Sequence, residues 1–355
     1  MRKTIFILAL ILLLQASSLP GKAEETPWQP LHDYALSLYR SGMFSEAVTE
    51  GMKALEAAEK GGGPKSLPAA STLGLIANAW HSLGQYAEAE QYYLRALAIH
   101  EEQNGPNHPD TASTLNNLAQ LRHFQGRYSE SEALYKRAIG SYEKSLGADD
   151  FSLATPLNNL AELYRSQGDP DAAEPLFFRA MGLYEQHLGP DHPNVAMCLN
   201  NLALLNQAGG RPNQAEAMFR RSLAIFETLG PQHSYVAASL NNLALLLFEE
   251  KKAAAAEPLF LRALTIYEKN LGEGHPSVAS VIHNLGELSR AKGDAKQSEA
   301  YFKRALAIKE RYLGTDHPSV AGTLENLAAL YRETGRTDEA LPMEERAAEI
   351  RRLPR

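Results

Sequence analysis

An eight-residue pattern of leucine, asparagine and alanine recurs along the chain. In its fullest form it reads LNNLAxLY, and successive copies start 42 residues apart, except for one step of 41 residues between Leu199 and Leu240. A fixed period of this size predicts a solenoid of stacked repeats. The copies start at Leu73, Leu115, Leu157, Leu199, Leu240, Ile282 and Leu324.

The apolar positions inside each copy have helical spacing. If the first residue is numbered zero, positions 0, +3, +4 and +7 lie within about 100° of one another on a helix. This pattern predicts an amphipathic helix, called helix A below. Six copies have glycine at +11, which predicts the end of helix A and a tight turn. One copy has Lys251 there, and we expect its turn to be looser or built differently.

A second helix, helix B, is predicted after this turn. Small residues occupy +16 and +23, and an aromatic residue occupies +20 in six copies. Counting 42 residues back from Leu73 reaches Leu31, where the same small residues recur in a degenerate form. The 41-residue step is a deletion just before the Leu229–Gly230 loop, and we expect the loop to absorb it. The pattern therefore predicts eight repeats over residues 31–353.

These marks resemble a known family. Small residues at +4, +16 and +23 with aromatic residues at +7 and +20 resemble the tetratricopeptide repeat, and the 42-residue form with LNNLA, RAL and LGxxHPxVA is similar to the repeats of kinesin light chains. The resemblance implies an all-α, right-handed superhelical solenoid of about eight helix pairs. It also implies a concave groove lined by the A helices. The repeats are expected to start near residues 31, 73, 115, 157, 199, 240, 282 and 324.

The first 23 residues have the pattern of a signal peptide. Arg2 and Lys3 precede an apolar run from Ile5 to Leu14, and a stretch of small and polar residues follows up to Ala23. The apolar run is much shorter than the roughly 20 residues that a membrane-spanning helix needs. We therefore predict a protein exported to the periplasm or secreted, with a linker over residues 24–30 and no membrane insertion after signal removal.

The net charge and the cysteine content bear on which partners and which bonds the protein can have. Without residues 1–23 the chain has 32 basic and 42 acidic residues, a formal charge of −10. This balance argues against nucleic acid or an anionic membrane as the main partner. The single cysteine, Cys198, cannot form an internal disulfide, and we interpret it as a small packing residue.

Asparagines mark the face of helix A opposite its apolar stripe. In tetratricopeptide arrays this face lines the groove. A side-chain amide both donates and accepts hydrogen bonds, so a ladder of amides can pair with the backbone of an extended peptide. Alternatively, the +2 asparagine binds a carbonyl of a neighbouring helix. The candidate groove residues are Asn116, Asn117, Asn158, Asn159, Asn200, Asn201, Asn241, Asn242, Asn284 and Asn326, with Arg165 and Arg290 at +8.

Other kinds of site are disfavoured. No repeat has a lysine or an arginine at −2, +1, +2 or +5, where several tetratricopeptide modules hold a C-terminal carboxylate with such residues. The chain has no HExxH, CxxC, GxSxG or GxGxxG motif, so we expect no enzymatic activity and no cofactor. One loop histidine per repeat suggests a turn residue, because equivalent atoms of stacked helices lie about 10 Å apart, too far to share a metal. These histidines are His108, His192, His233, His275 and His317.

The sequence thus predicts an exported scaffold for protein–protein interaction. It would bind an extended peptide or a partner protein in its concave groove. Two alternatives stay open at this stage. The chain could be a self-associating structural component of an envelope assembly, or an envelope enzyme without a recognisable motif.

Overall fold

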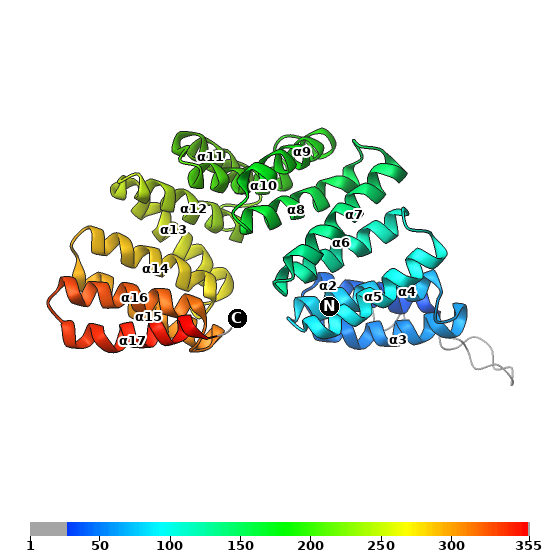
Figure 1. Ribbon diagram of the computed structural model, residues 1–355, viewed down its shortest axis with the longest axis horizontal. Coiled ribbons are helices and arrows are strands. Elements are labelled where there is room, and N and C mark those ends of the chain that lie inside the picture. The colour runs from blue at the N-terminus through cyan, green and yellow to red at the C-terminus, as the bar shows by residue number, and fades with distance from the viewer. Residues whose placement is uncertain (1–26, 354–355) are drawn as a thin grey trace, which may run out of the picture. The chain divides into compact units, whose positions relative to one another are not determined.

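The computed structural model describes residues 27–353. In this part of the chain, helices A and B of successive repeats alternate (Figure 1). The described part holds sixteen α-helices and one short 3-10 helix, and it contains no strand. The α-helices form the eight predicted pairs of helix A and helix B. The predicted signal peptide lies outside the described residues.

The described helices fall into two compact units, one that ends at residue 148 and one that starts at residue 149, and each is described by itself. The A helices are α2 (Trp28–Arg40), α4 (Leu67–Ser82) and α6 (Pro109–Phe124) in the first unit, and α8 (Ala154–Ser166), α10 (Pro193–Ala208), α12 (Ser234–Glu249), α14 (Pro276–Ala291) and α16 (Pro318–Glu333) in the second. The B helices are α3 (Phe44–Gly62), α5 (Tyr86–Gln103), α7 (Tyr128–Leu146), α9 (Pro170–Leu188), α11 (Pro212–Glu227), α13 (Ala253–Leu271), α15 (Ala295–Leu313) and α17 (Thr337–Arg352). The 3-10 helix η1 (Phe151–Leu153) precedes α8. Helix α2 starts at Trp28, so the first helix begins inside the segment 24–30 that we expected to be a linker.

Histidine begins most A helices. The ring Nδ1 of His192 accepts a hydrogen bond from the backbone N–H of Asn194 at 3.2 Å, which satisfies one of the free donors of the first turn. Pro193 occupies the first helical position, where its missing N–H costs nothing. The predicted role of the loop histidines as turn residues is thus explained by N-capping. The same Nδ1 contact occurs at His108, His233, His275 and His317.

The turn between helix A and helix B has one conformation in all repeats. The +11 glycines have positive φ, for example 69° at Gly210, and Lys251 adopts the same left-handed conformation with φ of 60°. Our expectation of a differently built turn at Lys251 was therefore wrong. The turn is kept although a side chain in this conformation costs about 1 kcal/mol.

The one-residue deletion shortens a helix. Helix α11 has 16 residues, whereas α9 has 19. The backbone N–H groups of Thr228, Leu229 and Gly230 each donate to the carbonyl three residues earlier, at 3.0–3.1 Å. The expectation that the loop absorbs the deletion was wrong, because the last turn of α11 tightens instead.

Neighbouring repeats share their cores. Phe177 of α9 is fully buried and packs with Ala161 and Ala173 of its own repeat and with Leu202 and Leu205 of the next. No single repeat can bury this ring alone, as expected for a solenoid. Among the described residues, no helix is long and apolar enough to cross a membrane.

The two helix layers are held together differently. Successive A helices lie close together, with Cα atoms within 8 Å of each other, for example in α2 with α4 and in α12 with α14. Successive B helices are bridged by long side chains, as where Arg221 Nη2 lies 2.8 Å from Glu185 Oε1. Because the A helices approach each other more closely, each unit curves with its A helices on the inner side. The asparagines at +1 and +2 lie in this inner layer.

Candidate functional site

In the second unit the asparagines form a ladder from repeat to repeat. The +2 residue of one A helix contacts the +1 residue of the A helix before it. This arrangement joins neighbouring repeats through polar side chains, mostly amides, instead of the helix carbonyls that we had considered. The three contacts are Asn242 Nδ2 to Asn200 Oδ1 at 3.1 Å, Asn284 Nδ2 to Asn241 Oδ1 at 2.9 Å, and Asn326 Nδ2 to His283 Nε2 at 3.1 Å.

The ladder keeps hydrogen-bonding capacity toward the outside. A carboxamide has two N–H donors and an oxygen that accepts twice, whereas one contact to the next repeat uses one donor and one lone pair. Asn200, Asn241 and Asn284 are half-buried, so each side chain still reaches the inner surface. The amides can therefore join repeats and bind a ligand at the same time. Their role in ligand binding stays a prediction.

Helices α8 and α10 carry the start of this ladder. Asn158 Oδ1 accepts a long hydrogen bond of 3.6 Å from the thiol of Cys198. Cys198 is fully buried, and this burial raises the pKa of its thiol to about 12. A thiol with this pKa stays protonated at neutral pH, which fits a packing residue. Asn159 and Asn201 are half-buried on the same two helices.

The two predicted groove arginines are paired with acids of their own helices. Arg165 Nη2 lies 2.5 Å from Glu162 Oε1 on α8. Arg290 Nη2 lies 2.9 Å from Glu287 Oε2 on α14. Each pair cancels most of the positive charge that the arginine would otherwise present to a ligand.

A buried basic cluster near the end of the second unit was missed by our sequence analysis. Lys309 Nζ of α15 donates to Thr323 Oγ1 at 2.8 Å, and Thr323 Oγ1 lies 3.4 Å from His283 Nδ1. Burial lowers the pKa of Lys309 to about 8. Burial, together with the charges of Lys309 and Arg290, lowers the pKa of His283 to about 4.

A break in the repeat pattern could have revealed this cluster. Lys309 is at position +27, which is aromatic in the four repeats before it. His283 is at +1, where the four preceding repeats have asparagine. Where one repeat has a different residue type from the others at the same position, its side chain makes interactions that the other repeats lack. The aromatic residues at +27 are Tyr142, Tyr184, Phe226 and Tyr267.

In the first unit the ladder is interrupted and a groove of about 520 Å³ lies in its place. Gly74 and Leu75 occupy +1 and +2 of α4, where later repeats have two asparagines. Asn117 Nδ2 therefore reaches Asn78 Oδ1, a turn further along α4, at 3.4 Å. Asn116 Nδ2 lies 3.2 Å from Asn117 Oδ1 on α6.

The walls of this groove combine aromatic, hydroxyl and carboxylate groups. On the α2 side, Trp28 Nε1 donates to Thr72 Oγ1 at 2.7 Å, and His32 Nδ1 lies 3.1 Å from the same oxygen. Asp110 and other polar residues of α6 line the opposite wall. His100 of α5 also lines the groove, and its Nδ1 is buried without a hydrogen-bond partner. His100 is at +27, the position of Lys309 in the second unit.

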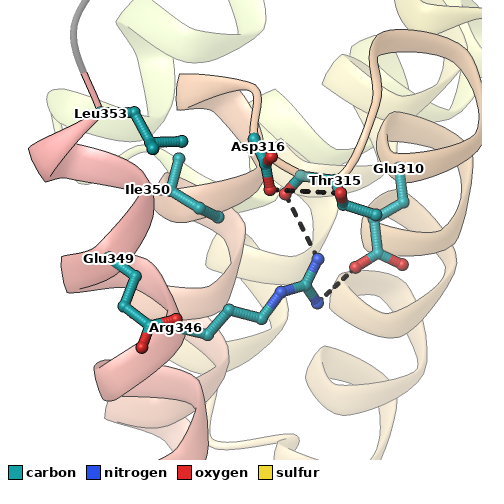
Figure 2. A pocket seen from close by; sticks show the side chains of 7 residues that line it. All are labelled: Glu310, Thr315, Asp316, Arg346, Glu349, Ile350 and Leu353. Atoms are coloured by element: carbon teal, nitrogen blue, oxygen red, sulfur yellow. Dashed lines mark hydrogen bonds and ion pairs between the residues drawn. The ribbon is translucent and has the colours of Figure 1, made fainter.

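Hollows on the B-helix side belong to the repeat itself. Figure 2 shows Arg346 of α17 reaching from one wall of a hollow of about 610 Å³ to Glu310, at 2.5 Å, and to the carbonyl of Thr315, at 3.3 Å. An equivalent hollow of about 410 Å³ lies beside Arg137 of α7. Because the same hollow recurs at the same place in the repeat, it is not a dedicated site.

The arginine of these hollows is a periodic feature that our sequence analysis overlooked. Position +22 is arginine in seven repeats, and the residue at +28 of the repeat before is glutamate. Within each unit these residues form ion pairs between successive B helices, as at Arg304 and Glu268, 2.6 Å apart. The arginines are Arg95, Arg137, Arg179, Arg221, Arg262, Arg304 and Arg346. In the described residues no three His, Cys, Asp or Glu side chains gather as metal ligands would.

Comparisons with known proteins agree with this architecture. A family model described as Tetratricopeptide repeat matches residues 29–102, 68–144, 152–228, 235–311 and 278–352. No curated protein matches the sequence significantly. The structure of BtubC (BKLC) from P. vanneervenii is 27% identical over 65% of this chain and 93% of its own, with a TM-score of 0.51.

Two further solved structures are similar in fold. TPR-like repeats from Podosopora anserina, described as kinesin light chain, are 20% identical over 59% of this chain and 99% of their own, with a TM-score of 0.50. The apo form of the quorum sensor NprR from B. thuringiensis is 14% identical over 98% of this chain and 94% of its own, with a TM-score of 0.69. The predicted likeness to kinesin light chain repeats is confirmed.

Proposed function

The chain belongs to the tetratricopeptide repeat family, and from this premise we propose that it is an exported, non-enzymatic scaffold that binds an extended peptide or a segment of a partner protein. The binding surface is the inner face formed by the A helices. The amide ladder of the second unit carries the proposal, because it places half-buried donors and acceptors along this face. The charged start of the chain and its apolar run from Ile5 to Leu14 support export.

The spacing of the ladder fits an extended chain. Packed helices lie about 8–10 Å apart, and a residue in extended conformation advances about 3.3 Å. Every third residue of the peptide therefore meets a new amide rung. A carboxamide can accept from a peptide N–H or donate to a peptide carbonyl, so the ladder recognises the backbone and tolerates many sequences.

A crosslinking experiment locates the binding face. Peptides that bind the purified protein are selected from a library of randomised twelve-residue sequences, and each is resynthesised with a photoreactive residue at its centre. Mass spectrometry is expected to find the crosslinks on the A helices, such as α10, α12 and α14. Crosslinks confined to the B helices would show that the proposed face is wrong.

A double substitution tests the amides themselves. Replacing Asn159 and Asn201 by alanine should weaken binding of the selected peptides by about 0.5–1.5 kcal/mol for each lost hydrogen bond. Calorimetric titration measures the affinity, and thermal melting is followed in parallel. The matched control is Asn213→Ala on α11, an exposed asparagine of a B helix, which should leave affinity unchanged.

The combination of affinity and melting decides between a ligand role and a structural role. If the double variant binds the peptides normally but melts well below the parent, the asparagines are structural. Amidating the peptide C-terminus should change little, because the backbone and not a terminal carboxylate is recognised. Loss of binding on amidation would reveal a carboxylate site and contradict the proposal.

A further inference from the structure

The groove of the first unit contains a space that the other repeats fill. Gly74 lies in the interior of α4, at the +1 position where the four following repeats have asparagine. A Cβ atom placed on Gly74 would meet no other atom within 4 Å. Glycine in the middle of a helix is destabilising, so this open position is kept at a cost. The space lies directly on the inner face to which we assign peptide binding.

One residue that lines the same groove has a buried polar atom that lacks a partner among the described residues. His100 is 7% exposed, and its Nδ1 makes no hydrogen bond. Buried polar atoms are nearly always hydrogen-bonded, and an exception calls for an explanation such as a ligand. Burial lowers the pKa of His100, so the ring is neutral near pH 7 and one of its nitrogens can accept a hydrogen bond.

The charge and aromatic groups of the groove define what it can accept. Among the described residues that line it, Asp110 is the only one with a charged side chain. Its carboxylate lies 3.4 Å from His108 Nδ1 and 3.3 Å from Asn104 Nδ2, and no lysine or arginine in the described part of the chain forms an ion pair with it. The rings of Trp28 and Tyr39 line the α2 side, and aromatic faces attract cations.

We infer that this groove binds the side chain of a lysine or arginine of an extended peptide. The cationic end lies between the Asp110 carboxylate and the aromatic rings, and it donates a hydrogen bond to the free ring nitrogen of His100. The space beside Gly74 admits the aliphatic part of the side chain. The inference rests on the proposed function, because it assigns a side-chain preference to peptides that bind the A-helix face.

Selection from the peptide library tests this inference. Peptides selected on the wild-type protein are expected to be enriched in lysine or arginine at one position. Replacing that residue by glutamine should weaken binding at least tenfold. Asp110→Asn should weaken the basic peptide by a similar factor and leave the glutamine peptide unchanged, which shows that the lost interaction is with the charge.

A second variant tests the space. Gly74→Asn restores the residue that later repeats have at this position, and it should abolish the preference for basic peptides. Because it removes a helical glycine, the variant is expected to melt no lower than the parent, so that unfolding cannot explain the loss. Gly140→Asn is the matched control, since Gly140 lies in α7, a B helix, with equally open surroundings, and it should bind as the parent does.

The possible outcomes separate this inference from the proposed function. Selected peptides with no basic enrichment, or with acidic enrichment, would overturn the inference and leave peptide binding intact. Basic peptides that bind Asp110→Asn and Gly74→Asn as tightly as the wild type would show that the basic side chain is bound elsewhere, and would also overturn it. If no peptide binds at all, the proposed function fails first, and the inference fails with it.

Discussion

At the residue scale, departures from the repeat pattern carry the individual chemistry of this protein. Position +27 is aromatic in the middle repeats but is His100 in the first unit and Lys309 in the second. Both side chains are buried. An aromatic side chain fills this position in the middle repeats, so a buried basic group at +27 is expected to change the stability of the protein and its dependence on pH.

The buried amine of Lys309 gives a testable pH dependence. Because the pKa of Lys309 is about 8 in the folded protein and 10.5 in the unfolded chain, the unfolded state binds the extra proton between these values. Folding is therefore penalised fully below pH 8, and the penalty disappears as the pH rises toward 10.5. Lys309→Met should raise the free energy of unfolding by about 1–3 kcal/mol at pH 7, and the gain should vanish near pH 10.5.

Urea denaturation at the two pH values measures this gain. Lys296→Met, which replaces an exposed lysine of the same helix, should change the free energy of unfolding by less than about 0.5 kcal/mol at either pH. A Lys309→Met variant that is destabilised at pH 7 would show that the hydrogen bond to Thr323 outweighs the desolvation of the amine.

At the element scale, each helix pair depends on the next one for its core. The +20 aromatic of helix B packs under the following helix A, as Phe177 does against Leu202 and Leu205. The small residues at +4 and +16, such as Ala161 and Ala173, give this ring its space. Stability is therefore a property of adjacent elements, and a change in one repeat weakens its neighbour as well.

Two neighbouring phenylalanines of α9 test this shared core. Phe177 is fully buried and Phe178 is 44% exposed. Phe177→Ala should lower the free energy of unfolding by about 3–5 kcal/mol, because it removes the ring and leaves a cavity between two repeats. Phe178→Ala should cost less than about 1 kcal/mol. Equal losses in chemical denaturation of the two variants would contradict the assigned helix register.

At the scale of the whole molecule, ion pairs link successive B helices within each unit, whereas a ladder of amides links successive A helices in the second unit. The inner layer has amides and the outer layer has ion pairs such as Arg262 Nη1 with Glu227 Oε1, 2.7 Å apart. Exposed ion pairs contribute little to stability individually. We therefore expect the outer ladder mainly to fix how successive B helices align with each other. The inner ladder offers uncharged polar groups, which suits recognition of a peptide backbone.

Export is a prediction that also belongs to the scale of the whole molecule. The basic start and short apolar run predict cleavage of the first residues during secretion. Mass spectrometry of the protein isolated from its native host should find a new N-terminus between Ala16 and Pro27. Protein with an intact Met1 in the cytosolic fraction would contradict export. The experiments on peptide binding do not depend on this result.

The sequence by itself determined the helices and their pairing. Apolar spacing of 3.6 residues, glycines at +11 and a period of 42 residues act locally or between adjacent repeats, so they can be read along the chain. The turn at Lys251 has the same left-handed conformation as in the other repeats, although they have glycine at this position. The loop histidines were correctly interpreted as turn residues, since capping is a local interaction.

The tertiary structure alone decided which polar groups meet. The bond between Asn242 and Asn200 joins residues 42 apart in sequence, and the period aligns them without saying whether they pair with each other, a carbonyl or a ligand. The free nitrogen of His100 depends on how the side chains around it pack, and no local pattern encodes that packing. Hydrogen bonds act over about 3 Å and depend on direction, so the final packing determines them.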